Sequence, residues 1–122
     1  QNIDMAPTFL SIGGASIPDS MHGIDLTPVM DGDVPNNWRK SLYYHFYESD
    51  DAMHKVAKHE GVYDGRYKLI HFYEIGEWEF FDREFDPYEL ENRINDRQYL
   101  DTIGEMKTEL KRLKIEYEVE TP

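Results

Sequence analysis

The middle third of the chain has the composition and alternation typical of β-strands. Aromatic and β-branched residues, which favour pleated and half-buried surfaces, are concentrated in three runs, 42–47, 61–73 and 78–82. Asp64-Gly65 divides the longest run. This dipeptide is the strongest short-range signal for a β-hairpin, and we expect it to form a type I′ turn. With Gly76 in the next turn, the pattern predicts three or four antiparallel strands.

The hydrophobic period changes after residue 95. Apolar residues then recur every three or four positions, at Tyr99, Ile103, Met106, Leu110, Leu113 and Tyr117. Residues with this spacing share one side of an α-helix. Asn95 or Asp96 is the expected N-cap, and Gly104 should weaken the helix locally. We expect the apolar stripe to cover one face of the sheet, and a coiled-coil seam is the alternative.

Residues 1–40 have a different character. A short helix is expected from Asp4 to Leu10, ended by Gly13-Gly14, because glycine commonly follows the last helical turn. Proline and glycine recur from residue 18 to residue 35, which is typical of surface loops. The fold class is therefore α+β, with an antiparallel sheet covered by a long C-terminal helix. A loop-rich arm of residues 1–40 precedes the sheet unit of residues 41–122.

Composition excludes several classes of function. The chain has 25 acidic and 13 basic residues, a net charge of −12, which opposes binding to nucleic acid and to anionic membranes. It has no cysteine, so disulfides, thiolate metal sites and cysteine nucleophiles are excluded. No apolar run approaches the roughly 20 residues of a spanning helix. The chain begins at Gln1 without a signal-peptide pattern, so we expect an interior cut of a longer protein or a processed end.

One locally basic patch offers candidate chemistry. It contains His54, Lys55, Lys58 and His59, and imidazole and ammonium groups together suit an anionic or hydroxyl-rich ligand. The competing interpretation is a solvated loop that leads into a strand. A zinc site would need a third ligand at a workable spacing. The remaining histidines of the strand runs provide none with a recognisable motif.

Neither the acidic nor the aromatic residues form a complete site. The acidic pairs in Asp31-Gly32-Asp33 and Asp50-Asp51 lack the spacing of a calcium-binding EF-hand loop, so we interpret them as solvated turns. The aromatic side chains could instead stack against sugars, although a small two-layer fold must bury many of them. The candidates are Tyr43, Tyr47, Tyr63, Tyr73 and Trp78.

Six short motifs nevertheless follow one another in a recognisable order. They are Asp4-Met5-Ala6-Pro7-Thr8, Ile17-Pro18 through Leu26, Trp38-Arg39 with Leu42 to Tyr47, Gly61-Val62-Tyr63 with Arg66 to Ile70, Trp78 to Asp82, and Asp86-Pro87-Tyr88-Glu89-Leu90 with Asn92. In this order the chain resembles, over residues 3–117, the C-terminal part of type I (formylglycine-dependent) sulfatases. It is most similar to the bacterial glycan sulfatases of the N-acetylglucosamine-6-sulfatase or heparan type.

The resemblance implies a small four-stranded antiparallel sheet covered by a long C-terminal helix. This subdomain would pack against a large α/β domain, of which residues 1–40 would be the last part. The resemblance also implies a calcium ion and a formylglycine in the whole enzyme. No residue here matches that machinery, because Ser16-Ile17-Pro18 has Ser20 where the formylglycine motif has arginine. The one family role that the resemblance implies for this chain is substrate binding. The candidate residues for it are His54, His59, Lys58 and Tyr63. Tyr63 stands where relatives commonly have arginine.

We therefore expect the C-terminal subdomain of a bacterial sulfatase that acts on sulfated glycans and is periplasmic or secreted. By itself it should be inactive, and it should complete the core and the sugar pocket of its parent. Its expected partners are the N-terminal sulfatase domain and, through the parent, a sulfated glycan. One alternative is a stand-alone carbohydrate-binding module. Another is an association domain that forms a homo-oligomer through residues 1–40 or the terminal helix.

Overall fold

The computed structural model describes residues 1–48 and 56–120. The chain divides into two compact units, residues 1–39 and residues 40–122, and each is described by itself. The first unit contains a short 3₁₀ helix, η1 (Asn2–Asp4), followed by α1 (Met5–Ile12) and the single turn α2 (Thr27–Met30). The predicted short helix is confirmed.

Buried polar side chains hold the first unit together. Asp4 is 1% exposed, and its Oδ1 accepts the Ile24 N–H at 2.8 Å and an Arg39 Nη at 2.5 Å. The Thr8 hydroxyl donates to the Asp4 carbonyl at 2.6 Å and accepts the Leu26 N–H at 2.9 Å. Burial raises the pKa of Asp4, but the Ile24 N–H and the Arg39 guanidinium hold it below its ordinary value. This pattern explains the Asp4-to-Thr8 motif, whose polar side chains fasten the following loop to α1.

The second unit contains an antiparallel sheet, as the alternation predicts, and the sheet has four strands. The strands are β1 (Leu42–Phe46), β2 (His59–Tyr63), β3 (Tyr67–Phe72) and β4 (Glu77–Asp82). They lie in the order β1-β2-β3-β4, so each pairs with its neighbour in the sequence. In this register Tyr43 is opposite Val62, Val62 is opposite Leu69, and Leu69 is opposite Phe80.

The turn between β2 and β3 differs from the expected type. A type I′ turn has positive φ at both central residues, whereas only Gly65, at φ 102°, has a positive value here. The Asp64 carboxylate accepts the N–H groups of Arg66 at 2.9 Å and Tyr67 at 2.7 Å. The predicted hairpin is confirmed and the predicted turn type is wrong. The physical reason is that the aspartate side chain bonds to the following backbone, which keeps Asp64 out of the left-handed region.

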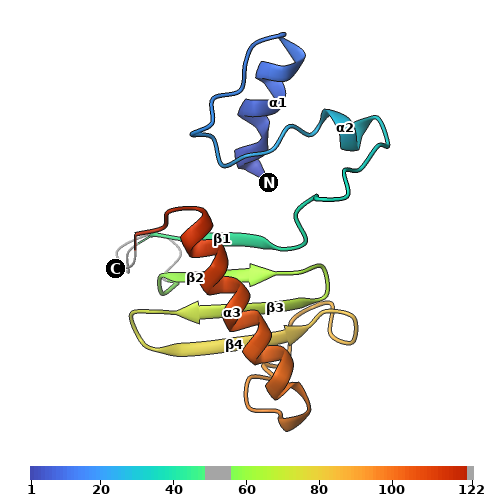
Figure 1. Cartoon of the computed structure of the whole chain (residues 1–122). Helices are drawn as coiled ribbons and strands as arrows, with labels where there is room; N and C mark the ends of the chain where they lie inside the picture. Colours follow the sequence, from blue (N-terminus) through green and yellow to red (C-terminus); the bar gives the residue numbers. More distant parts are fainter. Residues whose placement is uncertain (49–55, 121–122) are drawn as a thin grey trace. The chain divides into compact units, whose positions relative to one another are not determined.

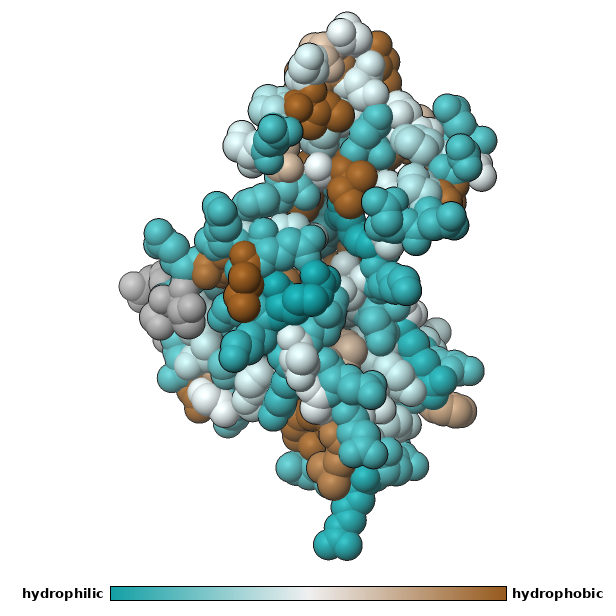
Figure 2. Space-filling model, viewed as in Figure 1, coloured by the Kyte–Doolittle hydropathy of each residue, from teal (hydrophilic) through white to brown (hydrophobic). Residues whose placement is uncertain are grey.

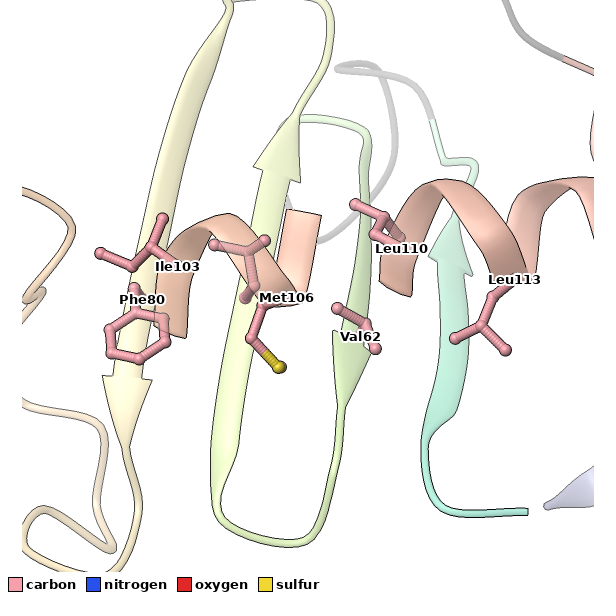
Figure 3. Packing of buried hydrophobic residues seen from close by; sticks show 7 residues of the cluster. Val62, Phe80, Ile103, Met106, Leu110 and Leu113 are labelled. Atoms are coloured by element: carbon pink, nitrogen blue, oxygen red, sulfur yellow. The ribbon is translucent and has the colours of Figure 1, made fainter. Parts of the chain in front are cut away.

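One long helix covers one face of this sheet. A 3₁₀ turn, η2 (Arg97–Tyr99), leads into α3 (Leu100–Glu116), and the Asp96 carboxylate caps the turn by accepting the Gln98 N–H at 3.2 Å. Figure 1 shows α3 running across the strands, and Figure 3 shows the side chains that meet between helix and sheet. The buried cluster consists of Val62, Leu69 and Phe80 from the sheet and Ile103, Met106, Leu110 and Leu113 from α3. The predicted apolar stripe is therefore the core, and the opposite side of α3 is mostly hydrophilic in Figure 2.

Strand alternation assigns the other side chains to one of two faces. The helix-side face carries the core residues together with Glu60, His71 and Trp78. The face that points away from α3, termed the far face, carries Tyr44 and Phe46 of β1, His59, Gly61 and Tyr63 of β2, and Lys68, Ile70 and Phe72 of β3.

A buried carboxylate fastens the C-terminal half of α3 to the sheet. Glu60 is 2% exposed, and its two oxygens accept Lys114 Nζ at 2.8 and 2.7 Å. The same carboxylate accepts His71 Nδ1 and the Tyr43 hydroxyl, each at 3.3 Å. Burial raises the pKa of Glu60, but Lys114 and His71 together bring it below its ordinary value. Glu60 is therefore an anion in the folded protein at neutral pH.

Substitution of two glycines by alanine should change the stability of the fold in opposite directions. A Cβ atom at Gly61 would lie 2.4 Å from the Tyr44 ring and 2.7 Å from the Leu69 carbonyl oxygen, so Gly61→Ala should destabilise the chain by about 2 kcal/mol. Gly104 lies within α3 with open space around its Cβ position, so Gly104→Ala should stabilise it by about 0.5–1 kcal/mol. Urea unfolding of both variants measures the difference. Equal effects of the same sign would contradict this packing.

Removing the charge of Glu60 should destabilise the protein in a pH-dependent way. Glu60→Gln leaves Lys114 without its carboxylate and should lower the free energy of unfolding at pH 7 by about 2 kcal/mol. Because the folded-state pKa of Glu60 is lowered, its stabilisation is present above the unfolded-state pKa and is lost as pH falls through the folded-state pKa. The gap between variant and wild type should therefore narrow in acid. Glu105→Gln, at an exposed position of α3, is the control and should change stability little at either pH.

Candidate functional site

The four predicted binding residues have different positions. His54 lies outside the described residues. Lys58 directly precedes β2, whereas His59 and Tyr63 are its first and last residues. Lys58 Nζ donates to Glu74 Oε1 at 2.8 Å. Its charge is therefore engaged with the loop between β3 and β4.

His59 lies within a row of aromatic rings on the far face. Its ring centroid is 5.2 Å from that of Phe46 and 5.1 Å from that of Phe72. We call Phe46, His59 and Phe72 the aromatic row. His59 Nδ1 lies 2.9 Å from the Ala57 carbonyl oxygen, which can only accept, so Nδ1 carries the proton. In the neutral ring Nε2 is then an acceptor, and among the described residues it has no partner.

The next position along β2 is a glycine, which makes room for Tyr44. The Tyr44 ring covers Gly61, since a Cβ there would be 2.4 Å from both Cζ and the hydroxyl oxygen. The Tyr44 hydroxyl is buried and has no hydrogen-bond partner among the described residues. Burial, with smaller contributions from Glu89 and Glu79, raises the pKa of Tyr44. The group therefore remains a protonated donor, and it lies beside the aromatic row, because the Tyr44 and His59 ring centroids are 6.1 Å apart.

Tyr63 shares the far face with His59 but lies at the other end of β2. Three residues lie between the two, and the rise of about 3.3 Å per residue of a strand places them about 13 Å apart. The Tyr63 hydroxyl donates to the Gly65 carbonyl at 2.6 Å, so it is occupied within its own hairpin. The Arg83 guanidinium lies 5.1 Å from the centroid of the Tyr63 ring and pairs with Glu89 at 3.0 Å. Arg83 thus places a positive charge near Tyr63, although the arginine expected from the relatives is absent at position 63 itself.

The structure therefore brings His59 together with residues that sequence reasoning missed. Phe46, Phe72 and Tyr44 surround it, whereas Lys58 and Tyr63 are engaged elsewhere. The signal that could have identified them is strand parity: once β1, β2 and β3 are paired, Phe46, His59 and Phe72 fall at matching positions of one face.

The chemistry of this site is that of binding. Aromatic faces and an imidazole acceptor suit the C–H faces and hydroxyl groups of a sugar. Among residues 1–48 and 56–120, no group of three or more His, Cys, Asp or Glu side chains could hold a metal ion. No helix in the same ranges is long and apolar enough to cross a membrane.

Sequence comparison relates this chain to bacterial sulfatases. It is 39% identical over 124 residues to the N-acetylglucosamine-6-O-sulfatase of Bacteroides thetaiotaomicron, covering 99% of this chain and 22% of the relative. It is 30% identical over 104 residues to an arylsulfatase of Clostridium perfringens, covering 85% of this chain and 20% of the relative. The chain thus spans about a fifth of the length of these curated relatives.

Structural comparison agrees. A solved structure of a protein in complex with its substrate D-glucosamine-2-N,6-O-disulfate matches with a TM-score of 0.93 and 38% identity, covering 99% of this chain and 25% of the other. The fold is therefore that of the corresponding part of that protein. The family model for the C-terminal region of N-sulphoglucosamine sulphohydrolase matches residues 1–116. Because this match includes nearly all of the chain, the protein belongs to the N-sulphoglucosamine sulphohydrolase, C-terminal, family.

Proposed function

We propose that this chain works as the C-terminal domain of a sulfatase that hydrolyses sulfate esters of glycans, with a sulfated amino sugar as the substrate class. Membership of the family and the similarity to an N-acetylglucosamine-6-O-sulfatase support this proposal. The observation that carries it within the molecule is the aromatic row, where His59 Nε2 offers an acceptor beside stacking surfaces. In this proposal the row forms part of the sugar pocket.

His59 is the residue that we assign to substrate contact. Its Nδ1 bond to Ala57 fixes the tautomer and leaves Nε2 to accept from a sugar hydroxyl. Lys58 and Tyr63 are weaker candidates, because Glu74 and the Gly65 carbonyl already engage them. His54 stays a prediction from sequence. Phe46 and Phe72 would hold the imidazole in place from both sides.

The first unit supports a role within a larger enzyme. Met5, Phe9 and Ile12 recur at spacings of four and three on α1, so they share one side of the helix. They are 50%, 64% and 64% exposed. An exposed apolar stripe of this kind is typical of a surface that packs against a partner. We assign that partner as the rest of the large α/β domain. Residues 1–40 would form the last stretch of this domain.

The nucleophile and the metal ion would belong to that other domain. The sequence contains no cysteine and no formylglycine motif, and the described residues provide no metal-binding group. Calcium and formylglycine, which the family resemblance implies for the whole enzyme, are therefore not assigned to any residue of this chain. A periplasmic or secreted location is part of the same proposal, supported by the bacterial sulfatases that the chain resembles.

The isolated 122-residue chain should be inactive. An assay with an aryl sulfate in the presence of calcium should give no turnover above background, because the reaction needs a nucleophile that these residues do not supply. The positive control is a longer protein that carries this chain behind an α/β sulfatase domain. Turnover by the isolated chain would overturn the proposed division of labour.

In the longer enzyme, substitutions along β2 should separate binding residues from structural ones. His59→Ala should lower kcat/KM for a 6-O-sulfated glucosamine about tenfold, mainly through KM, because one hydrogen bond to substrate is lost. His59→Gln, which retains a polar group near the position of Nε2, should recover much of that loss. Tyr63→Phe is the matched control, and it should change kcat/KM less than about twofold, since its hydroxyl is engaged by Gly65. Steady-state kinetics with thermal melts of each variant measures this. Equal losses in His59→Ala and Tyr63→Phe would contradict the assignment.

A further inference from the structure

A groove lies along α3 on the helix side of the sheet, opposite to the aromatic row. Its volume is about 460 Å³. Glu60 of β2 forms part of its lining, and the C-terminal half of α3 with the turn that follows forms the rest. Ligand pockets for small molecules commonly have volumes of about 300–1,000 Å³. The groove is therefore large enough for one or two sugar units.

One wall of the groove is formed by lysines. Lys107, Lys111 and Lys114 all line it, and their spacings of four and three place them on one side of the helix. Lys114 is bound to Glu60. Neither Lys107 nor Lys111 has a carboxylate partner among the described residues. Two cations that form no ion pair within the described ranges therefore lie together, with Glu118 also in the lining, on a chain whose net charge is −12.

The Lys107 ammonium is positioned by an aromatic stack. Its Nζ lies 4.5 Å from the centroid of the Trp78 ring, which is a cation–π geometry. Trp78 is itself stacked on His71, with ring centroids 3.9 Å apart, and His71 bonds to Glu60. The stack and the buried carboxylate thus limit the freedom of two of the three lysines before any ligand arrives. Pre-ordering of this kind lowers the entropic cost of binding.

Apart from the lysines and the carboxylates of Glu60 and Glu118, the lining is apolar. Leu110, Ile115 and Val119 contribute to it. The turn after α3 closes one end, where Glu118 has a φ of 50° and the Val119 N–H donates to the Lys114 carbonyl at 2.9 Å. Apolar side chains beside lysines match a ligand with both C–H surface and negative charge. A sulfated sugar has both.

We infer that this groove is a binding site for a sulfated saccharide, on the opposite face of the sheet from the aromatic row. Lys107 and Lys111 would each face a sulfate group, and the apolar lining would contact the sugar ring. The choice of sugar rests on the proposed function, whereas the preference for an anion rests on the lysines alone. A glycan chain held here would keep a polymeric substrate on the enzyme between turnovers.

Titration of the full 122-residue chain, followed by amide NMR shifts, tests this inference. The probes are a heparin-type disaccharide with 2-N- and 6-O-sulfate groups and the same disaccharide without sulfate. The sulfated probe should shift the amides of residues 107–119, and the unsulfated one should not. Lys107→Gln with Lys111→Gln should weaken binding about tenfold. Lys40→Gln with Arg97→Gln changes the net charge equally at exposed positions outside the groove, and it should weaken binding less than about twofold.

Three results would overturn the inference. They are the absence of shifts along α3, an equal loss of affinity in both double variants, and equally tight binding of a hexaglutamate peptide, which would indicate a general anion surface. Failure of the proposed function is distinguishable, because it would appear as absent sulfate hydrolysis in the longer enzyme.

Discussion

The second unit depends on one packing interaction, the burial of the apolar stripe of α3 against the sheet. Four helix residues and three strand residues form the cluster, and burying each large apolar side chain contributes about 1.5–3 kcal/mol. A small sheet without such a cover would be marginally stable. Because α3 covers only one face, every residue of the strands is assigned by parity to the core or to the far face. The positions of both candidate sites follow from this assignment.

Glu60 shows how closely the two faces are related. It is adjacent in sequence to His59, yet its side chain lies on the opposite face, where Lys114 and His71 hold it as a buried anion. One strand thus positions a polar anchor for the helix and an imidazole for the aromatic row. A shift of one residue in the pairing of β2 would exchange the two. The ion pair with Lys114 therefore opposes such a shift, because it would leave a buried carboxylate without its partner.

The first unit is stabilised by a different means. Asp4 and Thr8 bond the loop that follows α1, and Gly23 permits the close approach, since a Cβ there would be 1.9 Å from the Ile3 carbonyl oxygen. Polar bonds of this kind leave the apolar residues of α1 exposed rather than gathered into a core of their own. This division fits a segment whose apolar surface is completed by a larger domain, as we propose.

Local pattern in the sequence was sufficient for the secondary structure. The strands, the β2–β3 hairpin, the Asp96 cap and the long helix all depend on residues close in sequence, where alternation, capping and turn propensity operate. The ordered motifs were likewise sufficient for the family. The predicted type of the turn at Asp64 was wrong, because the Asp64-Gly65 dipeptide can adopt more than one turn conformation. Hydrogen bonds to the Asp64 carboxylate decided between them.

The tertiary structure decided which side chains meet. His59 was predicted as a binding residue, but its neighbours Phe46 and Phe72 come from other strands, and only the register brings the three rings together. The groove along α3 likewise combines Glu60 with lysines about fifty residues later. Such contacts join residues that are far apart in the sequence, and local sequence patterns do not predict them. For this chain, elements and family follow from short-range order in the sequence, whereas the composition of each site follows from the way the helix and the four strands are packed.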